Sequence, residues 1–280
     1  MDSAFYVPDG DRFVSTELTR GPWDPDAQHA GPPAALIARA LEQLPATSSA
    51  SPPGVSGSTA GWRIARLTFE ILRPVPIAPL TVGVEVVRPG RSVELLSASL
   101  ADERGELIRA SAWRLATRGI ELPPGLASED PASPARRERL LPGPAQGAEE
   151  AFFATGHEVG YHTGMEYRFV SGRFLDRGPA TVWMRMRHPL VPGESPSALQ
   201  RVLIAADSGN GVSATLDWSR YLFINVDLSV HLHRLPAGEW VCLDAITIPE
   251  PTGLGLADTA LYDERGPLGR ALQTLLVRER

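Results

Sequence analysis

The sequence contains no lysine: all 27 of its Lys and Arg residues are Arg, in a chain of 280 residues. This absence excludes a Schiff-base lysine, a Ser-x-x-Lys pair and the lysine of a P-loop. Cationic residues are also outnumbered, since 33 Asp and Glu leave a net charge of −6. We therefore expect no nucleic-acid partner, because phosphate binding requires clustered positive charge.

Cysteine and long apolar segments are scarce as well. The one cysteine, Cys242, cannot form an internal disulfide, and its apolar surroundings indicate a small buried residue rather than a nucleophile. The N-terminus shows no signal peptide, and no apolar run reaches the roughly 18 residues of a membrane-spanning helix. We expect a cytoplasmic protein without a membrane partner, and 43% hydrophobic residues are typical of globular proteins.

The two halves of the sequence repeat each other. The segment 102–105, Asp-Glu-Arg-Gly, recurs at 263–266, and the same offset pairs Arg73 with Arg234. A second tetrapeptide, Arg-Phe-Val-Ser at 12–15, recurs at 168–171 with nearly the same offset. Two matches in the same order predict a duplicated unit.

Each half has the same predicted order of elements: a short β segment, a Gly- and Pro-rich loop, one helix, and then strands. The helices are expected after Pro33, through Leu44, and after Pro196, through Ala206. Four strands are predicted after each helix, at 67–71, 80–87, 93–101 and 107–117, and at 222–233, 240–247, 255–262 and 269–278. One helix followed by four antiparallel strands, made twice, is an α+β fold.

The two predicted units are joined by a linker. Residues 119–150 contain six prolines, which is typical of a connection between units. We therefore divide the chain into an N-terminal unit, 1–118, a Pro-rich linker, 119–150, and a C-terminal unit, 151–280. A second tract rich in Ser, Gly and Pro, at 45–61, is expected to be a loop between the first helix and its strands.

Standard metal and cofactor motifs are incomplete. His157-Glu158 begins like a zincin helix, but Tyr161 stands where the second histidine would be. His231 and His233 share one strand face without a third ligand, so we interpret them as surface residues. No complete dinucleotide fingerprint is present. The sequence therefore predicts neither a metal nor a cofactor.

Three polar residues interrupt apolar patterns. Asp207 stands at the last turn of the second helix, where the helix dipole and burial both oppose a negative charge. Gln273 lies in an apolar strand, and Asn225 lies in a strand although Asn is disfavoured there. Polar residues in such costly places are expected at functional sites. The alternatives are a solvated helix end for Asp207 and an exposed edge-strand position for Gln273.

These residues belong to a set of motifs that resembles a known family. The sequence is similar to the double hotdog proteins of the thioesterase-like superfamily, in the acyl-CoA thioesterase II group. The matching segments are 21–23 (Gly-Pro-Trp), 28–33 (Gln-His-Ala-Gly-Pro-Pro), 72–76 (Leu-Arg-Pro-Val-Pro), 205–208 (Ala-Ala-Asp-Ser), 224–234, 238–240 (Gly-Glu-Trp) and Gln273. The resemblance covers nearly the whole chain apart from the two Pro-rich tracts.

The resemblance implies a fold and an activity. It implies a double hotdog, two tandem units in which a curved antiparallel sheet wraps around a helix. It also implies hydrolysis of an acyl-CoA, in lipid metabolism, by a water that Asp207, Asn225 and Gln273 orient without a covalent intermediate. Asn225 stands where the thioesterase II pattern has Thr, and Ser229 is a nearby hydroxyl that could share its role.

Further roles follow from the same resemblance. His29 is expected either to assist catalysis or to cap the turn before the first helix, and backbone N–H groups near Gly31 to polarise the thioester carbonyl. We thus expect His29, Gly31 and Ser229 to bind the substrate, and arginines to contact the CoA phosphates. Homo-oligomerisation stays open.

Two other functions compete with the hydrolase. A non-catalytic protein that binds acyl groups or CoA thioesters on the same fold is favoured if Asn225 disables the site. A double hotdog hydratase ranks last, because the hydratase pattern needs a histidine that residues 207–211 do not contain. An assay for release of thiol from acyl-CoA distinguishes the hydrolase from the non-catalytic binding protein.

Overall fold

The computed structural model describes residues 3–47, 61–127, 130, 133 and 141–280. Most of the Ser/Gly/Pro tract at 45–61 and much of the predicted linker lie outside these residues. The helical elements are η1 (Glu17–Thr19), α1 (Gly31–Gln43), η2 (Pro144–Gln146), α3 (Tyr161–Gly164), α4 (Ala198–Ala206) and α5 (Gly209–Val212). The strands of the first half are β1 (Tyr6–Asp9), β2 (Arg12–Ser15), β3 (Gly61–Ile71), β4 (Pro79–Arg88), β5 (Val93–Asp102) and β6 (Gly105–Thr117). Those of the second half are β7 (Met165–Ser171), β8 (Ala180–Met186), β9 (Tyr221–Asn225), β10 (Asp227–Leu232), β11 (Val241–Pro249), β12 (Leu254–Asp263) and β13 (Gly266–Glu279).

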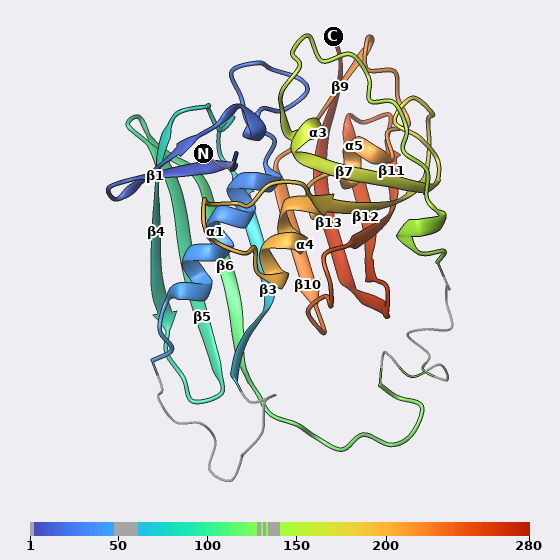
Figure 1. Cartoon of the computed structure of the whole chain (residues 1–280). Coiled ribbons are helices and arrows are strands. Elements are labelled where there is room, and N and C mark those ends of the chain that lie inside the picture. Colours follow the sequence, from blue (N-terminus) through green and yellow to red (C-terminus); the bar gives the residue numbers. More distant parts are fainter. Residues whose placement is uncertain (1–2, 48–60, 128–129, 131–132, 134–140) are drawn as a thin grey trace.

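The strands of the described residues form one antiparallel sheet of 13 strands. Their order is β1-β2-β4-β5-β6-β3-β10-β13-β12-β11-β8-β7, and β9 pairs with β13 beside β10. The order is mirrored about the β3–β10 contact, because the run β4-β5-β6-β3 on one side faces β10-β13-β12-β11 on the other. Figure 1 shows this curved sheet behind the two longer helices. The few helices and the large antiparallel sheet confirm the predicted α+β class.

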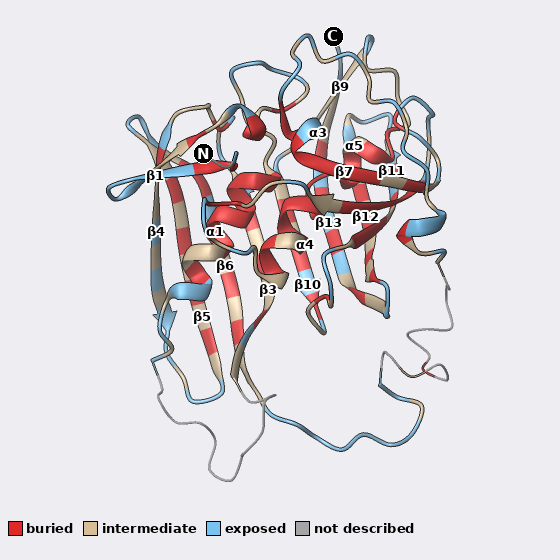
Figure 2. Cartoon of the chain, viewed as in Figure 1, coloured by how far each residue is buried: buried red, intermediate tan, exposed pale blue. Residues whose placement is uncertain are grey.

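The core lies between the sheet and the helices α1 and α4, which pack against each other. Helix α4 starts close to its predicted position after Pro196, whereas α1 starts at Gly31 and includes the two prolines that the sequence analysis placed before it. Pro32 and Pro33 occupy the first turn of α1, and Ser197 caps α4 by accepting the backbone N–H of Gln200 over 3.1 Å. Figure 2 shows that most residues of both helices are buried. This packing brings the C-terminal end of α4 into the middle of the molecule.

The repeated Asp-Glu-Arg-Gly segment forms the same turn in both halves. It connects β5 to β6 at 102–105 and β12 to β13 at 263–266. In the first turn Arg73 Nη2 lies 3.3 Å from Asp102 Oδ1, and in the second Arg234 Nη2 lies 2.6 Å from Asp263 Oδ1. Each arginine also donates to the carbonyl of the glycine that ends its segment. The offset that the sequence predicted therefore joins residues with equivalent contacts.

The second tetrapeptide match does not join equivalent strands. Residues 12–15 form β2, next to last on one side of the sheet, whereas residues 168–171 end β7, the last strand on the other. The C-terminal part of the predicted linker belongs structurally to the second half. Trp183 of β8 donates its indole N–H to Pro142 O over 2.8 Å, and Ala148 forms a bridge with Phe169 of β7.

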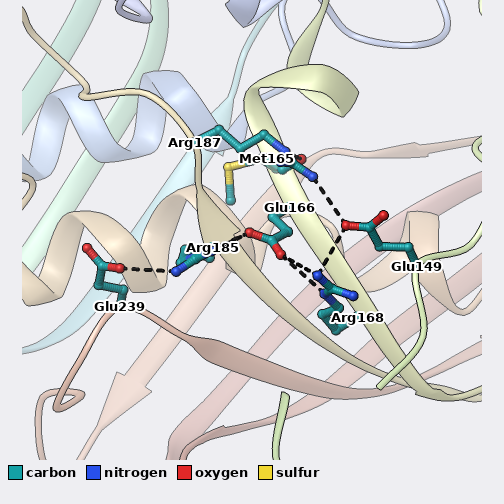
Figure 3. Close-up of polar contacts among 7 residues, drawn as sticks. All are labelled: Glu149, Met165, Glu166, Arg168, Arg185, Arg187 and Glu239. Carbon is teal, nitrogen blue, oxygen red and sulfur yellow. Dashed lines mark hydrogen bonds and ion pairs between the residues drawn. The ribbon is translucent and has the colours of Figure 1, made fainter. Parts of the chain in front are cut away.

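Arginine provides the positive charge of the buried and partly buried ion pairs. In Figure 3 the buried Glu166 on β7 contacts Arg185 at 2.6 Å and Arg168 at 3.1 Å. Burial acts to raise the pKa of Glu166, but the hydrogen bonds from Arg185 and Arg168 outweigh it, and the pKa lies below its ordinary value. Glu149 and Glu239 pair with the outer sides of the arginines. This cluster is internally neutralised, which is typical of a structural network.

The described residues were also examined for membrane-spanning helices and metal sites. Within them, no helix combines the length and the apolar composition needed to cross a membrane. Nor do three or more His, Cys, Asp or Glu side chains come together there in a way that could hold a metal ion. Cys242 is buried, as the sequence predicted, and His231 and His233 are exposed.

Candidate active site

Asp207 occupies the C-terminal end of α4, as the sequence predicted. It is the C-cap residue, and its backbone has a helical conformation. The residue is only 8% exposed, so the alternative of a solvated helix end is excluded. A buried carboxylate at the negative end of a helix requires hydrogen-bond donors to stay ionised. Three side chains supply contacts to it, from β13, β9 and the segment before α1.

Gln273 is the first of these partners. Its Nε2 donates to Asp207 Oδ1 over 3.0 Å and to the backbone oxygen of Asp207 over 3.1 Å. Its Oε1 accepts the backbone N–H of Asn210 over 3.1 Å. The strand β13 lies inside the sheet and Gln273 is 2% exposed, so the alternative of an exposed edge position is wrong. Both of these donor contacts are made to Asp207.

Asn225 is the second partner, and an irregularity in the sheet places it. Its Nδ2 donates to Asp207 Oδ1 over 2.8 Å. Asn225 lies opposite Leu275 of β13, whereas Ser229, four residues later, lies opposite Leu272, only three residues away. One extra residue on this strand is a β-bulge, located at Val226 between β9 and β10. The predicted single strand 222–233 is therefore two strands.

The bulge separates Asn225 from Ser229. In an unbroken strand, residues four apart share a face. Here Ser229 alternates with Leu228 and Val230, which are both buried, so its hydroxyl lies on the opposite face of the sheet. The structure brings Asn225 to Asp207 and does not bring Ser229 there. The expectation that Ser229 shares the role of Asn225 is corrected by this geometry.

His29 is the third partner. Its Nδ1 lies 3.0 Å from Asp207 Oδ2 and 3.1 Å from the backbone N of Gly31. One nitrogen serves one of these contacts at a time: protonated, it donates to Asp207, and unprotonated, it accepts the N–H of Gly31. Burial lowers the pKa of His29, although the Asp207 charge acts in the opposite direction. His29 thus contacts both the aspartate and the helix start.

Gly31 is required by close packing of the helices. A Cβ atom at this position would lie 2.3 Å from the carbonyl oxygen of Ile204 on α4. Only glycine lets the first turn of α1 approach α4 this closely. The N–H of Gly31 is directed at His29, and Pro32 and Pro33 have no N–H to offer. The position therefore sets the distance between His29 and Asp207.

Tyr161 is a site residue that the sequence reasoning missed as such. Its ring stacks on the His29 ring, with centroids 3.8 Å apart. Its hydroxyl donates to Ile204 O over 2.6 Å and lies 2.9 Å from Ser208 Oγ. Burial raises the pKa of Tyr161 well above its ordinary value, so the hydroxyl keeps its proton. Tyr161 fixes the plane of the imidazole. Tyr161 lies in a Gly-rich segment of the sequence, where nothing indicated a contact with His29.

A pocket of about 610 Å³ opens beside the carboxylate. Asp207, Asn225, His29 and Tyr161 form part of its wall. Two arginines, Arg73 and Arg280, also line it. A pocket of this size is typical of small-molecule sites. The described cluster can therefore present a carboxylate, held by amides and an imidazole, to a ligand in the pocket.

Such an arrangement is suited to activating a water. A buried carboxylate can accept a proton from water, and fixed hydrogen bonds keep its geometry constant during reaction. No side chain of the cluster is a Ser, Cys or Lys nucleophile activated by a base, since Ser208 contacts the protonated Tyr161. The chemistry that fits best is hydrolysis with water as the nucleophile.

Comparison with known families matches both halves. The profile of the acyl-CoA thioesterase N-terminal domain matches residues 19–115, and that of the acyl-CoA thioesterase C-terminal domain matches residues 137–277. No protein of curated function matches the sequence.

Solved structures with the same fold cover nearly the whole chain. A protein of Thermobifida fusca, named as a candidate thioesterase II, has 17% identity and a TM-score of 0.71 over 98% of this chain and 95% of its own. A conserved protein with a hot dog fold from Alicyclobacillus acidocaldarius has 15% identity and a TM-score of 0.67, over 98% and 95%. The tesB protein of Mycobacterium avium subsp. paratuberculosis has 15% identity and a TM-score of 0.64, over 98% and 95%. At these identities the likeness shows the hotdog fold.

Proposed function

The chain belongs to the acyl-CoA thioesterase family, and from this premise we propose that it hydrolyses an acyl-CoA thioester to a free acid and CoA. The observation that carries the proposal is the buried carboxylate of Asp207. It is held by Asn225, Gln273 and His29 and forms part of the wall of the pocket. A site that only binds acyl chains has no need of an oriented buried carboxylate, which is costly to bury.

In the proposed reaction Asp207 is the general base. The oxygen of a water attacks the thioester carbonyl carbon while Asp207 accepts a proton from that water. The tetrahedral intermediate then collapses, the C–S bond breaks, and the proton passes to the thiolate of CoA. Water supplies an OH group to the acid and a hydrogen to CoA, so the step balances without a covalent intermediate and without a cofactor.

The other residues have different proposed roles. Asn225 lies in the pocket wall, so its amide both holds Asp207 and can contact the attacking water. Gln273 is a positioning residue, because it is buried and both its N–H groups are used by Asp207. His29 lies in the pocket wall at the positive end of the α1 dipole, which favours the negative charge that develops on the carbonyl oxygen. The N–H of Gly31 is directed at His29, and Pro32 and Pro33 have none, so we do not assign polarisation of the carbonyl to backbone N–H groups of this turn.

We also infer that the fold is a double hotdog made by internal duplication. The mirrored strand order, the paired helices α1 and α4, and the equivalent Arg73–Asp102 and Arg234–Asp263 pairs support this inference. Under this proposal the first unit spans 1–118 and the second 151–280. The two units differ at the site. The second unit has Gln273 on β13, whereas the equivalent residue of the first unit is Ala112. Only the second copy would then carry the carboxylate machinery.

The proposal is tested by measuring both products. Wild-type protein is incubated with acyl-CoA thioesters of several lengths, and free thiol and free acid are quantified. Equal amounts of both, formed faster than in the absence of protein, support hydrolysis. Asp207→Asn should bind the same thioesters without turning them over. Binding by the wild type with no turnover of any thioester would instead support the non-catalytic acyl-binding protein.

A further inference from the structure

The pocket beside Asp207 is lined by an unusual share of the chain's aromatic residues. Nine of its Phe, Trp and Tyr residues line this one pocket, although the whole chain has only 8 Phe, 6 Trp and 5 Tyr. Small-molecule pockets are commonly lined by apolar and aromatic side chains, but a linear alkyl chain asks only for apolar surface. The concentration of rings in this wall therefore indicates what shape of ligand it accepts.

Four of these rings contact one another in the wall of the pocket. The Trp23 ring stacks on Phe153 at 5.0 Å with planes 20° apart, and it lies 4.5 Å from the Trp218 ring. Trp218 in turn lies 5.0 Å from Phe223. We call these four residues the aromatic group. They come from the segment before α1, the segment before α3, the segment before β9, and β9 itself.

The aromatic group keeps accessible surface although its members contact one another. Trp23 is 52% exposed, and the other three are half-buried. A large apolar ring that stays exposed next to a cluster of polar groups is a feature of binding sites, because apolar surface gains free energy when a ligand covers it. Planar rings favour planar partners in stacked or edge-on geometry.

The aromatic group and the carboxylate line one and the same pocket. Trp23, Trp218 and Phe223 line it together with Asp207 and Asn225. A thioester bound in this pocket would therefore have both the carboxylate and the rings in the wall around it. Two parts of an acyl-CoA could supply a planar ring: the acyl group and the adenine of CoA.

The acyl group is the better fit to this position. Adenine is separated from the thioester by the whole pantetheine and diphosphate chain, and it brings phosphates that need cations. The guanidinium groups of the two arginines in the pocket lining already make hydrogen bonds within the protein. Arg73 donates to Asp102 and to the carbonyls of Gly105 and Glu106, and Arg280 donates to the carbonyl of Trp218.

We propose that the substrate's acyl group carries a planar aromatic ring, which stacks in the aromatic group while the thioester carbonyl lies at Asp207. This inference rests on the proposed thioester hydrolysis and names the substrate class of the same site. Trp23 and Phe153 are then residues that determine specificity.

The test compares three acyl groups of eight carbons: phenylacetyl-CoA, cyclohexylacetyl-CoA and octanoyl-CoA. The first two differ in the aromaticity of the ring at nearly the same size. We expect kcat/KM for phenylacetyl-CoA to exceed that for each of the others by about tenfold, the upper range of a single aromatic pair. In Trp23→Leu and Phe153→Leu the ratio of phenylacetyl to cyclohexylacetyl should fall toward one. Trp240→Leu, a ring outside the pocket that contacts Arg185, should keep the wild-type ratio.

A second arm identifies the source of the ring. The same acyl groups are presented as N-acetylcysteamine thioesters, which lack the nucleotide. If the preference for phenylacetyl persists, the acyl ring is the one that binds. If Trp23→Leu lowers kcat/KM for all CoA thioesters equally and leaves the N-acetylcysteamine thioesters unchanged, the aromatic group binds adenine and the inference is overturned.

A third measurement separates this inference from the proposed function. Trp23 and Trp218 fluorescence is titrated with phenylacetate, cyclohexylacetate and octanoate. Tighter binding of phenylacetate in a protein that hydrolyses none of the thioesters would end the proposed hydrolase and leave the ring specificity standing. Hydrolysis in which octanoyl-CoA or cyclohexylacetyl-CoA is turned over as well as phenylacetyl-CoA would end the ring specificity and leave the hydrolase standing.

Discussion

Asn225 donates its side-chain N–H to Asp207 Oδ1 over 2.8 Å, from a strand that a one-residue bulge turns toward the end of α4. Without the bulge at Val226, the residues of β9 and β10 with the same parity would share one face, and Asn225 would point away from the core with Ser229. β-Bulges are frequent beside active sites for this reason. Through this contact Asn225 lies beside Asp207, at the position where the resembled thioesterase II pattern has Thr.

The donor role of Asn225 predicts how its replacements behave. A Thr hydroxyl can donate to the carboxylate, and a Val of the same shape cannot. We expect Asn225→Thr to keep kcat within about tenfold of wild type and Asn225→Val to lose about a hundredfold or more, the lower part of the range for a group that supports acid–base catalysis. Initial rates of thiol release measure both. Equal rates in the Thr and Val variants would contradict the donor role.

Gln273 is predicted to act through the position of Asp207. In Gln273→Leu the carboxylate loses its buried donor, so kcat should fall about 10- to 100-fold, as it does when the support of a catalytic group is removed, with little change in KM. Gln200→Leu is the matched control. Gln200 is also a buried glutamine, but it lies in the first turn of α4 and donates to Glu42 of α1 instead of Asp207. A rise in KM with unchanged kcat in Gln273→Leu would indicate that Gln273 contacts the substrate instead.

Gly31 is predicted to be a stability requirement. The Cβ of Gly31→Ala would lie 2.3 Å from Ile204 O, so α1 and α4 must separate. Overpacking of this kind costs about 1–3 kcal/mol in free energy of unfolding, which lowers Tm by roughly 2–12 °C in a protein of this size. Gly211→Ala is the control, because a Cβ there meets no atom within 4 Å. Thermal unfolding of both variants decides: a Gly31→Ala protein as stable as wild type contradicts the packing.

The buried pair of Glu94 and Arg114 predicts a pH-dependent stability. Arg114 donates to Glu94 Oε2 from Nε over 2.8 Å, and Thr47 donates its backbone N–H over 2.9 Å. Burial acts to raise the pKa of Glu94, yet the hydrogen bonds from Thr47 and Arg114 outweigh it and the pKa is lowered. Arg114, on β6, also donates to the carbonyls of Leu44 and Pro45, so the pair connects the C-terminal end of α1 to the sheet by hydrogen bonds.

A lowered pKa in the folded state has a definite sign. The pair stabilises the protein above the ordinary Glu pKa, about 4.3, and this stability is lost as pH falls through the lowered value. Glu94→Gln leaves Arg114 without its carboxylate and should cost about 3 kcal/mol at pH 7. Denaturant unfolding from pH 7 down to about 3 should show this difference shrinking in acid. A difference that grows in acid would contradict the sign.

Much of the fold follows from local signals in the sequence. Pro32 and Pro33 mark the start of α1, and Ser197 with the following apolar spacing marks α4. Local signals could not reveal the bulge, because residues 222–233 alternate without any Gly or Pro that would mark a break. Its position depends on pairing with β13, more than 40 residues away.

The site was predictable where a residue broke a pattern. Asp207, Asn225 and Gln273 stand out because each is polar in an apolar element, and the structure places all three in contact. Tyr161 could not be found in this way, because a Tyr in a Gly-rich segment breaks no apolar pattern, and its contacts with His29 and Ser208 span long stretches of sequence. The aromatic group escaped for the same reason: its members come from separate segments.

The most direct test of the central claim is the single-turnover rate of Asp207→Asn. With enzyme in excess over acyl-CoA, the rate constant reports the chemical step and not product release. The control is Asp9→Asn, an exposed carboxylate on β1 that pairs with Arg12. We predict that Asp207→Asn binds the substrate within about threefold of wild type and reacts 10²- to 10⁴-fold more slowly, the contribution of a general base, while Asp9→Asn reacts like wild type. A single-turnover rate in Asp207→Asn equal to that of wild type would contradict the account.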